Sequence, residues 1–560
     1  MNLKKHLHWL LYLLFVISCA RQSAPTGGPQ DSIPPVLLRS SPPNEAINFK
    51  GRVLEFTFSE LIQLNVPKEQ LIITPTVGKD YDIKARNNKV LLTLDKDLAD
   101  STTYTINFRE AVADITERNP AENLRIAIST GNYIDSLSIE GTVKNLLDQK
   151  SLKDATVALH VYTDTFSILK HPAVYLTKSD ENGLFKLENI KPGNYAIYAL
   201  IDQNRNLIVD SKNEPYAFLS EPLKLDSLVK NVNLQLIKLD ARELKMTSAR
   251  PYNTYFNIRS SKNLKKATLQ ALDSSFLFYS FGEDKQNILL YNSFDQIDSL
   301  EINVTLEDSI QNKFDTTLFA KFTTKDATPE KFSMDILSTT LIPFKGIFKT
   351  EIKFTKPIKE VNFDNLLFKI DSLNSLTFKQ EDLNYDLLNK ILSIEKKFDS
   401  KIYKSEEIKQ DPEASIKGEK TRRKQLQNQL YLGKGAFISI EQDSSRKFKQ
   451  NVRAPAFEDL GIIATQIYAG NTKVIIQLLN SKKNIIASVT HKNKATFEDL
   501  EPNDYLLRII LDRNGNGIWD PGNYLKKEEP EDIVYYENEN HVREIKLKAN
   551  FEIGPLLITY

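Results

Sequence analysis

Residues 53–62 read VLEFTFSELI, and this stretch decides the fold class of the chain. Leu54, Phe56 and Phe58 occupy every second position, which is the period of a strand with one buried face. The same alternation returns in three more short runs bounded by turn residues, at residues 90–94, 104–108 and 124–128. Closely spaced short strands of this kind predict an all-β fold of sandwich type.

Residues 33–131 resemble the SbsA-type bacterial Ig-like domain. The resemblance rests on PPVLLRSSPPNEAINF at residues 34–49, on VLEFTFSELI, and on TTYTINF at residues 102–108. In that family, a proline and a short gap lead into a strand that ends in Phe-Ser-Glu. The resemblance implies a structural and adhesive module, and it brings no catalytic residues with it.

Residues 134–238 resemble the carboxypeptidase-regulatory, or prealbumin-like, β-sandwich. The family's two turns are matched by Asp180, Gly183 and Phe185, followed by Pro192, Gly193 and Tyr195. Part of this domain, ENIKPGNYAIYALIDQNRN at residues 188–206, recurs without a gap as EDLEPNDYLLRIILDRNGN at residues 498–516. Residues 451–560 are therefore predicted to form a second prealbumin-like domain. Asn503 replaces Gly193, and because asparagine also tolerates a positive φ, we expect the same turn in both copies.

The middle of the chain predicts two further sandwiches, at residues 239–326 and 327–450. The second is interpreted as Ig-like, because Phe354-Thr355-Lys356 stands where Phe58-Ser59-Glu60 stands in the first Ig-like domain. It carries a highly charged insertion at residues 404–429, which is either a solvated segment or a docking element.

The N-terminus predicts a lipid anchor. Residues 9–17 (WLLYLLFVI) form an apolar core of signal-peptide length, and Val16-Ile17-Ser18-Cys19 matches the bacterial lipobox. We expect residues 1–18 to be a lipoprotein signal peptide, Cys19 to be acylated, and residues 19–32 to be a flexible tether rich in Pro, Gly and Ser. The predicted fold is thus a string of Ig-like and prealbumin-like sandwiches behind a lipidated tether.

Composition argues against several classes of function. Lysine and arginine number 74 and aspartate and glutamate 73, so no electrostatic footprint for nucleic acid is present. Cys19 is the only cysteine, which rules out a disulfide framework. The sequence contains no H-E-x-x-H, G-x-S-x-G or phosphate-binding glycine motif, and its histidines have no metal-ligand spacing. The chain is therefore predicted not to be an enzyme.

One loop pattern has a chemical rationale, and both prealbumin-like copies carry it after the same strand. The second copy has oxygen-bearing side chains at positions 1, 3, 5 and 9 of a calcium loop of EF-hand type, and Gly517 fills position 6. These side chains are Asp512, Asn514, Asn516 and Asp520; the first copy has Asp202, Asn204, Asn206 and Asp210, with Leu207 at position 6. Asparagine stands at position 12 in both copies, where an EF-hand has a bidentate glutamate. The alternative is that these side chains hydrogen-bond their own backbone in an Asx-rich hairpin.

A second pattern places Asp before Ser and then an aliphatic residue. It resembles the O-glycosylation sequon of exported Bacteroidota proteins, and the implied acceptors are Ser136, Ser227, Ser299, Ser309 and Ser372. The alternative is that Asp-Ser ends a turn and the aliphatic residue begins a strand.

The order of lipobox, tether, Ig-like domain and prealbumin-like domain resembles the Ig-like-domain lipoproteins of Bacteroidota. The resemblance implies an outer-membrane lipoprotein without catalytic activity, anchored in the membrane lipid through acylated Cys19, on either the periplasmic or the cell-surface face. Two functions stay open. One is a scaffold that binds an envelope protein, for example an outer-membrane barrel complex; the other is glycan binding for a nutrient-uptake system. Exposed aromatic side chains on one sandwich face would favour glycan, and a broad apolar or charged patch would favour protein.

Substitution of the predicted lipidated residue tests the anchor. Cys19→Ser should move the protein from the membrane fraction to the soluble periplasmic or culture fraction, because the acyl chains are the expected membrane contact. Fractionation followed by immunoblotting measures this, and unchanged membrane association of the variant would contradict the prediction.

Overall fold

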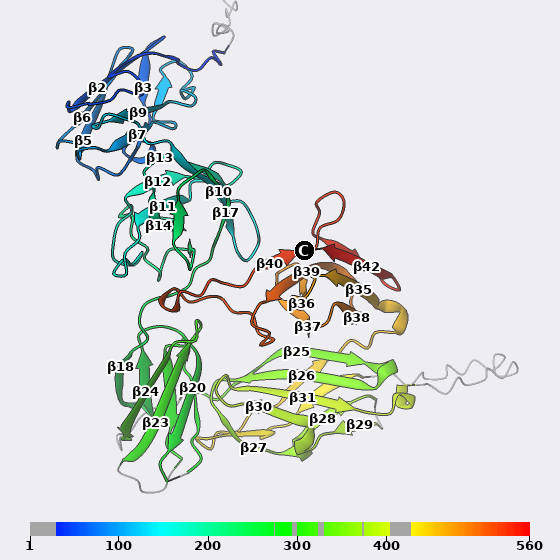
Figure 1. Cartoon of the computed structure of the whole chain (residues 1–560). Coiled ribbons are helices and arrows are strands. Elements are labelled where there is room, and N and C mark those ends of the chain that lie inside the picture. Colours follow the sequence, from blue (N-terminus) through cyan, green and yellow to red (C-terminus); the bar gives the residue numbers. More distant parts are fainter. Residues whose placement is uncertain are drawn as a thin grey trace, which may run out of the picture.

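The computed structural model describes residues 30–273, 275–293, 299–322, 330–371, 374–403 and 427–559. Within these residues, β-sheets pack in five groups, each around its own apolar core, and we number these sandwiches from the N-terminus (Figure 1). The all-β fold class that the sequence predicted is therefore confirmed. No helix in the described part of the chain is long and apolar enough to span a membrane.

The first sandwich contains the stretch that opened the sequence analysis. Its sheet β1-β2-β6-β5 faces the sheet β4-β7-β9, and β3 pairs with β8. Leu54, Phe56 and Phe58 are at most 1 % exposed, as the alternation predicted. The elements are β1 (Leu37–Ser41), β2 (Val53–Phe58), β3 (Ile62–Leu64), α2 (Pro67–Gln70), β4 (Ile72–Thr74), β5 (Tyr81–Arg86), β6 (Lys89–Leu94), β7 (Thr103–Asn107), β8 (Val112–Asp114) and β9 (Arg125–Ser129).

The second and fifth sandwiches share one topology, which agrees with the sequence repeat. In the second, β10 pairs antiparallel with β13 and parallel with β17, and β14 lies in the facing sheet between β11 and both β15 and β16. The strands are β10 (Leu137–Asn145), β11 (Thr156–Val161), β12 (Tyr175–Lys178), β13 (Leu184–Ile190), β14 (Gly193–Leu200), β15 (Tyr216–Phe218), β16 (Leu223–Leu225) and β17 (Val229–Leu236).

In the fifth sandwich, β35 has the same two kinds of neighbour, β38 antiparallel and β42 parallel, and β39 lies between β36 and both β40 and β41. The elements are η6 (Phe457–Asp459), β35 (Gly461–Tyr468), β36 (Lys473–Asn480), β37 (Ile485–Thr490), β38 (Lys494–Leu500), β39 (Asn503–Asp512), η7 (Tyr524–Lys526), β40 (Ile533–Tyr535), β41 (Ile545–Leu547) and β42 (Glu552–Thr559).

The turn expected at Gly193 and Asn503 differs from the prediction in one respect. Neither residue has a positive φ; the nearby left-handed residues are Asn189 and Asp499, with φ of 59° and 57°, and they lie near the ends of the strands that precede the turn, β13 and β38. Asn and Asp tolerate this region because their short side chains can hydrogen-bond locally. Glycine at position 193 is therefore not needed for backbone conformation, which explains why asparagine replaces it.

The third sandwich packs the sheet β18-β19-β22-β21 against β20-β23-β24. The fourth repeats the sheet order of the first: β25-β26-β31-β30 corresponds to β1-β2-β6-β5, and β27-β33 corresponds to β3-β8. Of the predicted charged insertion at residues 404–429, residues 404–426 lie outside the described residues, and strand β32 begins at Gln429.

The elements of the third sandwich are β18 (Met246–Tyr252), β19 (Tyr255–Ser260), β20 (Leu264–Ala271), β21 (Tyr279–Phe281), β22 (Asn287–Tyr291), β23 (Leu300–Asp308) and β24 (Lys313–Ala320). Those of the fourth are β25 (Met334–Ile342), η1 (Pro343–Lys345), β26 (Ile347–Phe354), β27 (Ile358–Val361), η2 (Phe363–Asn365), β28 (Leu366–Lys369), β29 (Ser375–Thr377), η3 (Gln380–Asp382), β30 (Leu383–Asp386), β31 (Ile391–Lys397), η4 (Ser400–Tyr403), β32 (Gln429–Leu432), β33 (Phe437–Ser439) and β34 (Phe448–Asn451).

The fifth sandwich docks on the second, although the two lie at opposite ends of the middle region. One apolar cluster joins Leu146 and Ile237 of the second sandwich to five residues of the fifth: Ile475, Leu479, Ile510, Ile533 and Tyr535. Strand β36 is consequently buried on both faces, which accounts for its nearly continuous apolar sequence, KVIIQLLN. The Tyr535 hydroxyl also donates a hydrogen bond to the carbonyl oxygen of Leu147 at 2.7 Å.

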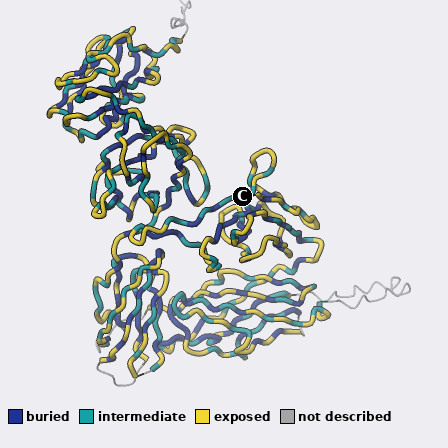
Figure 2. Tube along the Cα trace, in the orientation of Figure 1, coloured by how far each residue is buried: buried dark blue, intermediate teal, exposed yellow. Residues whose placement is uncertain are grey.

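The fifth sandwich contacts the third and the fourth as well. Asn523 is 2 % exposed and donates through Nδ2 to the carbonyl of Ile310 in the third sandwich at 2.9 Å. Lys345 of the fourth sandwich forms ion pairs with Glu498 and Asp499 at 2.8 and 2.6 Å. The chain therefore folds back on itself over sandwiches two to five, while the first sandwich projects beyond them (Figure 1). Figure 2 shows that buried residues run through the interior of each sandwich.

A charge placed in the docking cluster should separate the second and fifth sandwiches. Leu479 is fully buried there, and burying an unpaired carboxylate is costly, so Leu479→Asp should undock the fifth sandwich. Limited proteolysis should then cleave near residue 451 at least ten times faster. The control is Ile485→Asp, because Ile485 lies in the same sheet but is 53 % exposed. Equal cleavage rates for both variants would contradict this account of the interface.

Candidate functional site

The loop after β39 folds around its own acidic side chains. Asp512 accepts hydrogen bonds from the backbone N–H groups of Asn516 at 3.1 Å and Gly517 at 2.8 Å. Asn514 and Asn516 both donate through Nδ2 to Asp520 Oδ2, at 2.5 and 2.9 Å. The four side chains that the sequence analysis selected are therefore brought together in one loop.

In the corresponding loop of the second sandwich, the first aspartate also accepts hydrogen bonds from the loop backbone, but the last aspartate bonds a different asparagine. Asp202 accepts from the backbone N–H groups of Asn206 at 3.2 Å and Leu207 at 3.0 Å. Leu207 has a φ of 59°, so the backbone takes the left-handed turn at position 6 without a glycine. Asp210 bonds the side chain of Asn213 at 2.7 Å, and no hydrogen bond to Asn204 or Asn206 is found for it among the described residues.

A buried glutamate closes each loop, and the sequence analysis missed both. Glu531 accepts from the backbone N–H groups of Arg513 at 2.8 Å and Asp520 at 3.0 Å, and it is 3 % exposed. Glu214 does the same for Gln203 and Asp210, both at 2.9 Å. The two glutamates are recognised as equivalent only by their hydrogen bonds. Their positions in the sequence differ, because Glu214 follows Asn213 directly while Glu531 lies much farther along its loop.

Asp512 has a second partner that sequence spacing could not show. Nε2 of His491, at the end of β37, lies 2.6 Å from Asp512 Oδ2. Burial opposes ionisation of Asp512, but the hydrogen bonds from His491 and the loop backbone outweigh it and hold the pKa of this carboxyl below 3.8. Burial raises the pKa of Glu531, and the charges of Asp520 and Asp512 add to that effect.

Both loops thus have the bonding pattern of an Asx-stabilised turn, which is one of the two alternatives that the sequence left open. The carboxylate oxygens already accept hydrogen bonds from the loop's own backbone and amide groups. Calcium binding at either loop stays a prediction.

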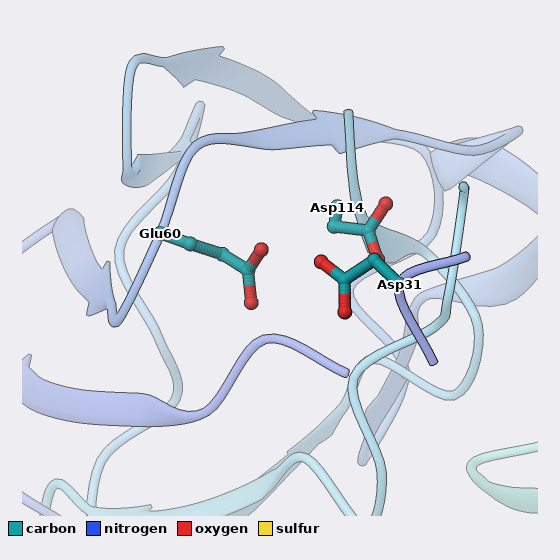
Figure 3. Close-up of side chains that lie close together, drawn as sticks. All are labelled: Asp31, Glu60 and Asp114. Atoms are coloured by element: carbon teal, nitrogen blue, oxygen red, sulfur yellow. The ribbon is translucent and has the colours of Figure 1, made fainter. Parts of the chain in front are cut away.

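A different group of carboxylates lies closer together than those of either loop. Among the described residues, Asp31, Glu60 and Asp114 are the one group of three potential metal-ligating Asp, Glu, His or Cys side chains whose ligand atoms all lie within 4.8 Å of one another. Figure 3 shows the three side chains converging from separate segments. Glu60 follows β2, Asp114 ends β8, and Asp31 precedes the first strand. The sequence analysis placed Asp31 in the tether, yet Asn119 Nδ2 donates to its carbonyl oxygen at 2.9 Å.

The three carboxyls, which we call the acidic triad, differ in their environments. Burial, followed by the charges of Asp114 and Asp31, raises the pKa of Glu60. Burial also opposes ionisation of Asp114, but bonds from the backbone of Glu117 and the side chain of Asn119 outweigh it and lower its pKa. The sequence signal for this site was the Phe-Ser-Glu motif, which was interpreted only as the end of a strand.

The remaining sequence-predicted residues are not brought into a common site. Ser136, Ser227, Ser299 and Ser309 are exposed and lie in separate segments. The last of these follows Asp308, whose Oδ1 accepts from the backbone of Ile310 at 3.0 Å, so an Asp-Ser turn is present there. Ser372 and Cys19 lie outside the described residues.

Comparison with known proteins identifies one part of the chain. Residues 31–130 match the family described as bacterial Ig-like domain, which agrees with the sequence resemblance over the first sandwich. No curated protein matches the chain.

Solved structures were compared with the whole chain. BcpA, the major pilin subunit of Bacillus cereus, is 10 % identical, with 76 % of this chain and 97 % of that chain covered and a TM-score of 0.12. The TIE protein of Bacillus anthracis is 9 % identical, with 100 % and 78 % covered and a TM-score of 0.12. The glucan-utilisation protein SGBP-B of Bacteroides ovatus is 9 % identical, with 66 % and 88 % covered and a TM-score of 0.14. At these TM-scores, whole-chain likeness carries no argument about function.

Removing the central carboxylate should weaken the loop after β39. Asp512→Ala leaves two backbone N–H groups without their acceptor, which should lower the free energy of unfolding by about 1.5–3 kcal/mol at pH 7. Trp519, the only tryptophan after residue 9, reports the loop by fluorescence during urea denaturation.

The same comparison has a defined pH dependence. Because folding lowers the pKa of Asp512, its ionised carboxyl stabilises the fold above the unfolded-state pKa, and this contribution is lost as the pH falls through the folded-state value below 3.8. The difference between wild type and Asp512→Ala should therefore persist at pH 5 and shrink toward pH 3. A difference that is already absent at pH 7 would contradict the structural role of Asp512.

Proposed function

We propose that this chain is a lipid-anchored, non-enzymatic scaffold of the bacterial cell envelope that binds a protein partner, such as an outer-membrane barrel complex. The observation that carries the proposal is the docking of the fifth sandwich on the second, third and fourth. A chain closed in this way holds surfaces from distant parts of the sequence in fixed relative positions. Fixed surfaces are what a scaffold needs, because little ordering entropy is then lost when a partner binds.

The described histidines are not gathered in one site: His491 is paired with Asp512 in the fifth sandwich, whereas His160 and His171 belong to the second. His160 and His171 have ring centroids 6.2 Å apart and flank Phe166, against which His160 stacks at 4.2 Å. His171 Nδ1 accepts from the backbone N–H of Ser167 at 3.0 Å, and His160 Nδ1 lies 2.8 Å from the carbonyl of Val161. Both imidazoles thus contact the backbone of their own loop. His541 is 89 % exposed in its side chain and pairs with Glu537.

Partner capture tests the scaffold. The wild-type chain, crosslinked in intact cells, should retain the same envelope proteins in replicate purifications. The Leu479→Asp variant, in which the fifth sandwich is undocked, should lose at least nine tenths of that material, and the Ile485→Asp control should keep it. Equal recovery with the docked and undocked chains would contradict a function that depends on the closed arrangement.

A strip of aromatic side chains in the third sandwich favours a second candidate, glycan binding. Tyr252 lies 5.6 Å from Tyr255, which lies 5.9 Å from Tyr291 by ring centroids. Phe278 packs against the same cluster and lies 5.0 Å from Phe276. The two ends are open, since Tyr252 is 55 % and Phe276 is 69 % exposed. Tyr255 and Tyr291, between these ends, are buried at 8 % and 2 % exposed, so only the end rings of Tyr252 and Phe276 are open to stack on a sugar ring.

Affinity electrophoresis separates this candidate from the scaffold. In gels that contain a soluble neutral polysaccharide, the wild-type chain should migrate more slowly, and Tyr252→Ala with Phe276→Ala should restore normal migration. Phe319→Ala is the matched control, because Phe319 is 59 % exposed in the same sandwich but lies on β24 of the other sheet. If no polysaccharide retards the wild-type chain, the glycan candidate falls and the scaffold stands.

A further inference from the structure

The acidic triad of the first sandwich has a counterpart in the fourth. Ser59 donates its backbone N–H to the carbonyl of Val36 at 2.9 Å, and its hydroxyl accepts from Val36 N at 3.0 Å. Thr355 makes the same two bonds with Ser333, at 3.1 and 3.0 Å. These paired contacts align Ser59 with Thr355, so the next residue, Glu60, corresponds to Lys356.

The strand opposite gives the same alignment. Asp114 faces Ile62 in the β3-β8 pair, and Ser439 faces Ile358 in the β27-β33 pair. Each side chain then accepts hydrogen bonds from backbone N–H groups of the turn that follows, which ends at Asn119 in the first sandwich and at Asp443 in the fourth. Glu60 and Asp114 of the triad therefore occupy the positions that Lys356 and Ser439 occupy in the fourth sandwich.

The charge at the position of Glu60 is reversed between the two sandwiches. In the fourth, Lys356 is 1 % exposed, and its ammonium group binds the carboxylates of Glu441 and of Asp443, the latter at 2.6 Å. In the first, a carboxylate replaces the ammonium group and two more carboxylates surround it. No lysine, arginine or histidine among the described residues is found in an ion pair with Asp31, Glu60 or Asp114. In the fourth sandwich, the residue at the position of Glu60 thus carries a buried cation, which carboxylates of the turn after β33 hold.

We propose that Asp31, Glu60 and Asp114 bind a divalent cation with oxygen coordination, of the calcium class, at the position where the fourth sandwich has the Lys356 ammonium group. Three carboxylates offer only hard oxygen ligands and no nitrogen or sulfur, which suits calcium and disfavours zinc. The ligands come from three separate segments, and calcium accepts the irregular geometry that such a set provides.

The bound cation would fix the start of the chain to the first sandwich. Asp31 precedes the first strand, whereas Glu60 and Asp114 belong to the sandwich itself. Without a cation, three mutually repelling carboxylates oppose this contact; with it, residue 31 becomes the point at which the sandwich is held.

Equilibrium dialysis of the full chain in detergent with radioactive calcium tests the proposal. Glu60→Lys installs the arrangement of the fourth sandwich and should bind one calcium ion fewer per chain than wild type. Asp31→Asn should also lose that ion, and since Asp31 lies outside all strands, this variant keeps the fold if Glu60→Lys does not. Circular dichroism monitors folding of each variant. The control, Asp202→Asn with Asp512→Asn, removes the two predicted calcium loops and should leave the triad's ion bound.

The outcomes are exclusive. Loss of one ion in folded Asp31→Asn, and in Glu60→Lys where that variant folds, with the ion retained in the loop control, supports the site. Equal calcium binding by wild type and folded Asp31→Asn, or no calcium bound by wild type at millimolar concentration, overturns it.

Discussion

The apolar contact between the second and fifth sandwiches is the constraint on which the arrangement of the chain depends. Leu479 and Ile510 are at most 1 % exposed there, although both lie on the face of their sheet that turns away from the fifth sandwich's own core. Each fully buried aliphatic side chain contributes about 1.5–3 kcal/mol, so this cluster outweighs the polar contacts around it. Without it, the fifth sandwich would expose a broad apolar face to water.

Docking also explains the length of the loop between β39 and β40. Its shorter equivalent in the second sandwich, residues 201–215, forms an ion pair with the first sandwich, between Arg205 and Glu69 at 2.7 Å, whereas residues 513–532 contact both the second and the third. Asn523 donates a hydrogen bond to the carbonyl of Ile310 in the third sandwich. The Tyr524 hydroxyl accepts one from the backbone N–H of Ile168 in the second at 3.0 Å. The first part of the loop, residues 512–520, is therefore held by its own hydrogen bonds, and its later part, which includes Asn523 and Tyr524, contacts the other sandwiches.

The fold was predicted from local periodicity, which contains no information about contacts between segments distant in the sequence. The alternation at Leu54, Phe56 and Phe58 predicted the strand because burial on one face has a period of two. The continuous apolar sequence of β36 indicates a strand that is buried on both faces. It does not indicate which other part of the chain covers the outer face. The site residues divide in the same way: Asp512 and Asp520 are close in sequence and were found, while Glu531 and His491 become neighbours only through folding. The triad was missed because its three carboxylates come from three segments.

A crosslinking measurement on the intact chain tests the closed arrangement most directly. Gln235 of the second sandwich donates through Nε2 to Asp532 of the fifth at 2.7 Å, and Cys19 is the only native cysteine. In a Cys19→Ser background, Gln235→Cys with Asp532→Cys should be joined within one chain by a short bis-maleimide reagent. Mass spectrometry should find the two peptides linked in nearly all monomers at dilute protein concentration. Monomers without the link, or links that form only between chains, would contradict the claim that the fifth sandwich closes the chain on the second.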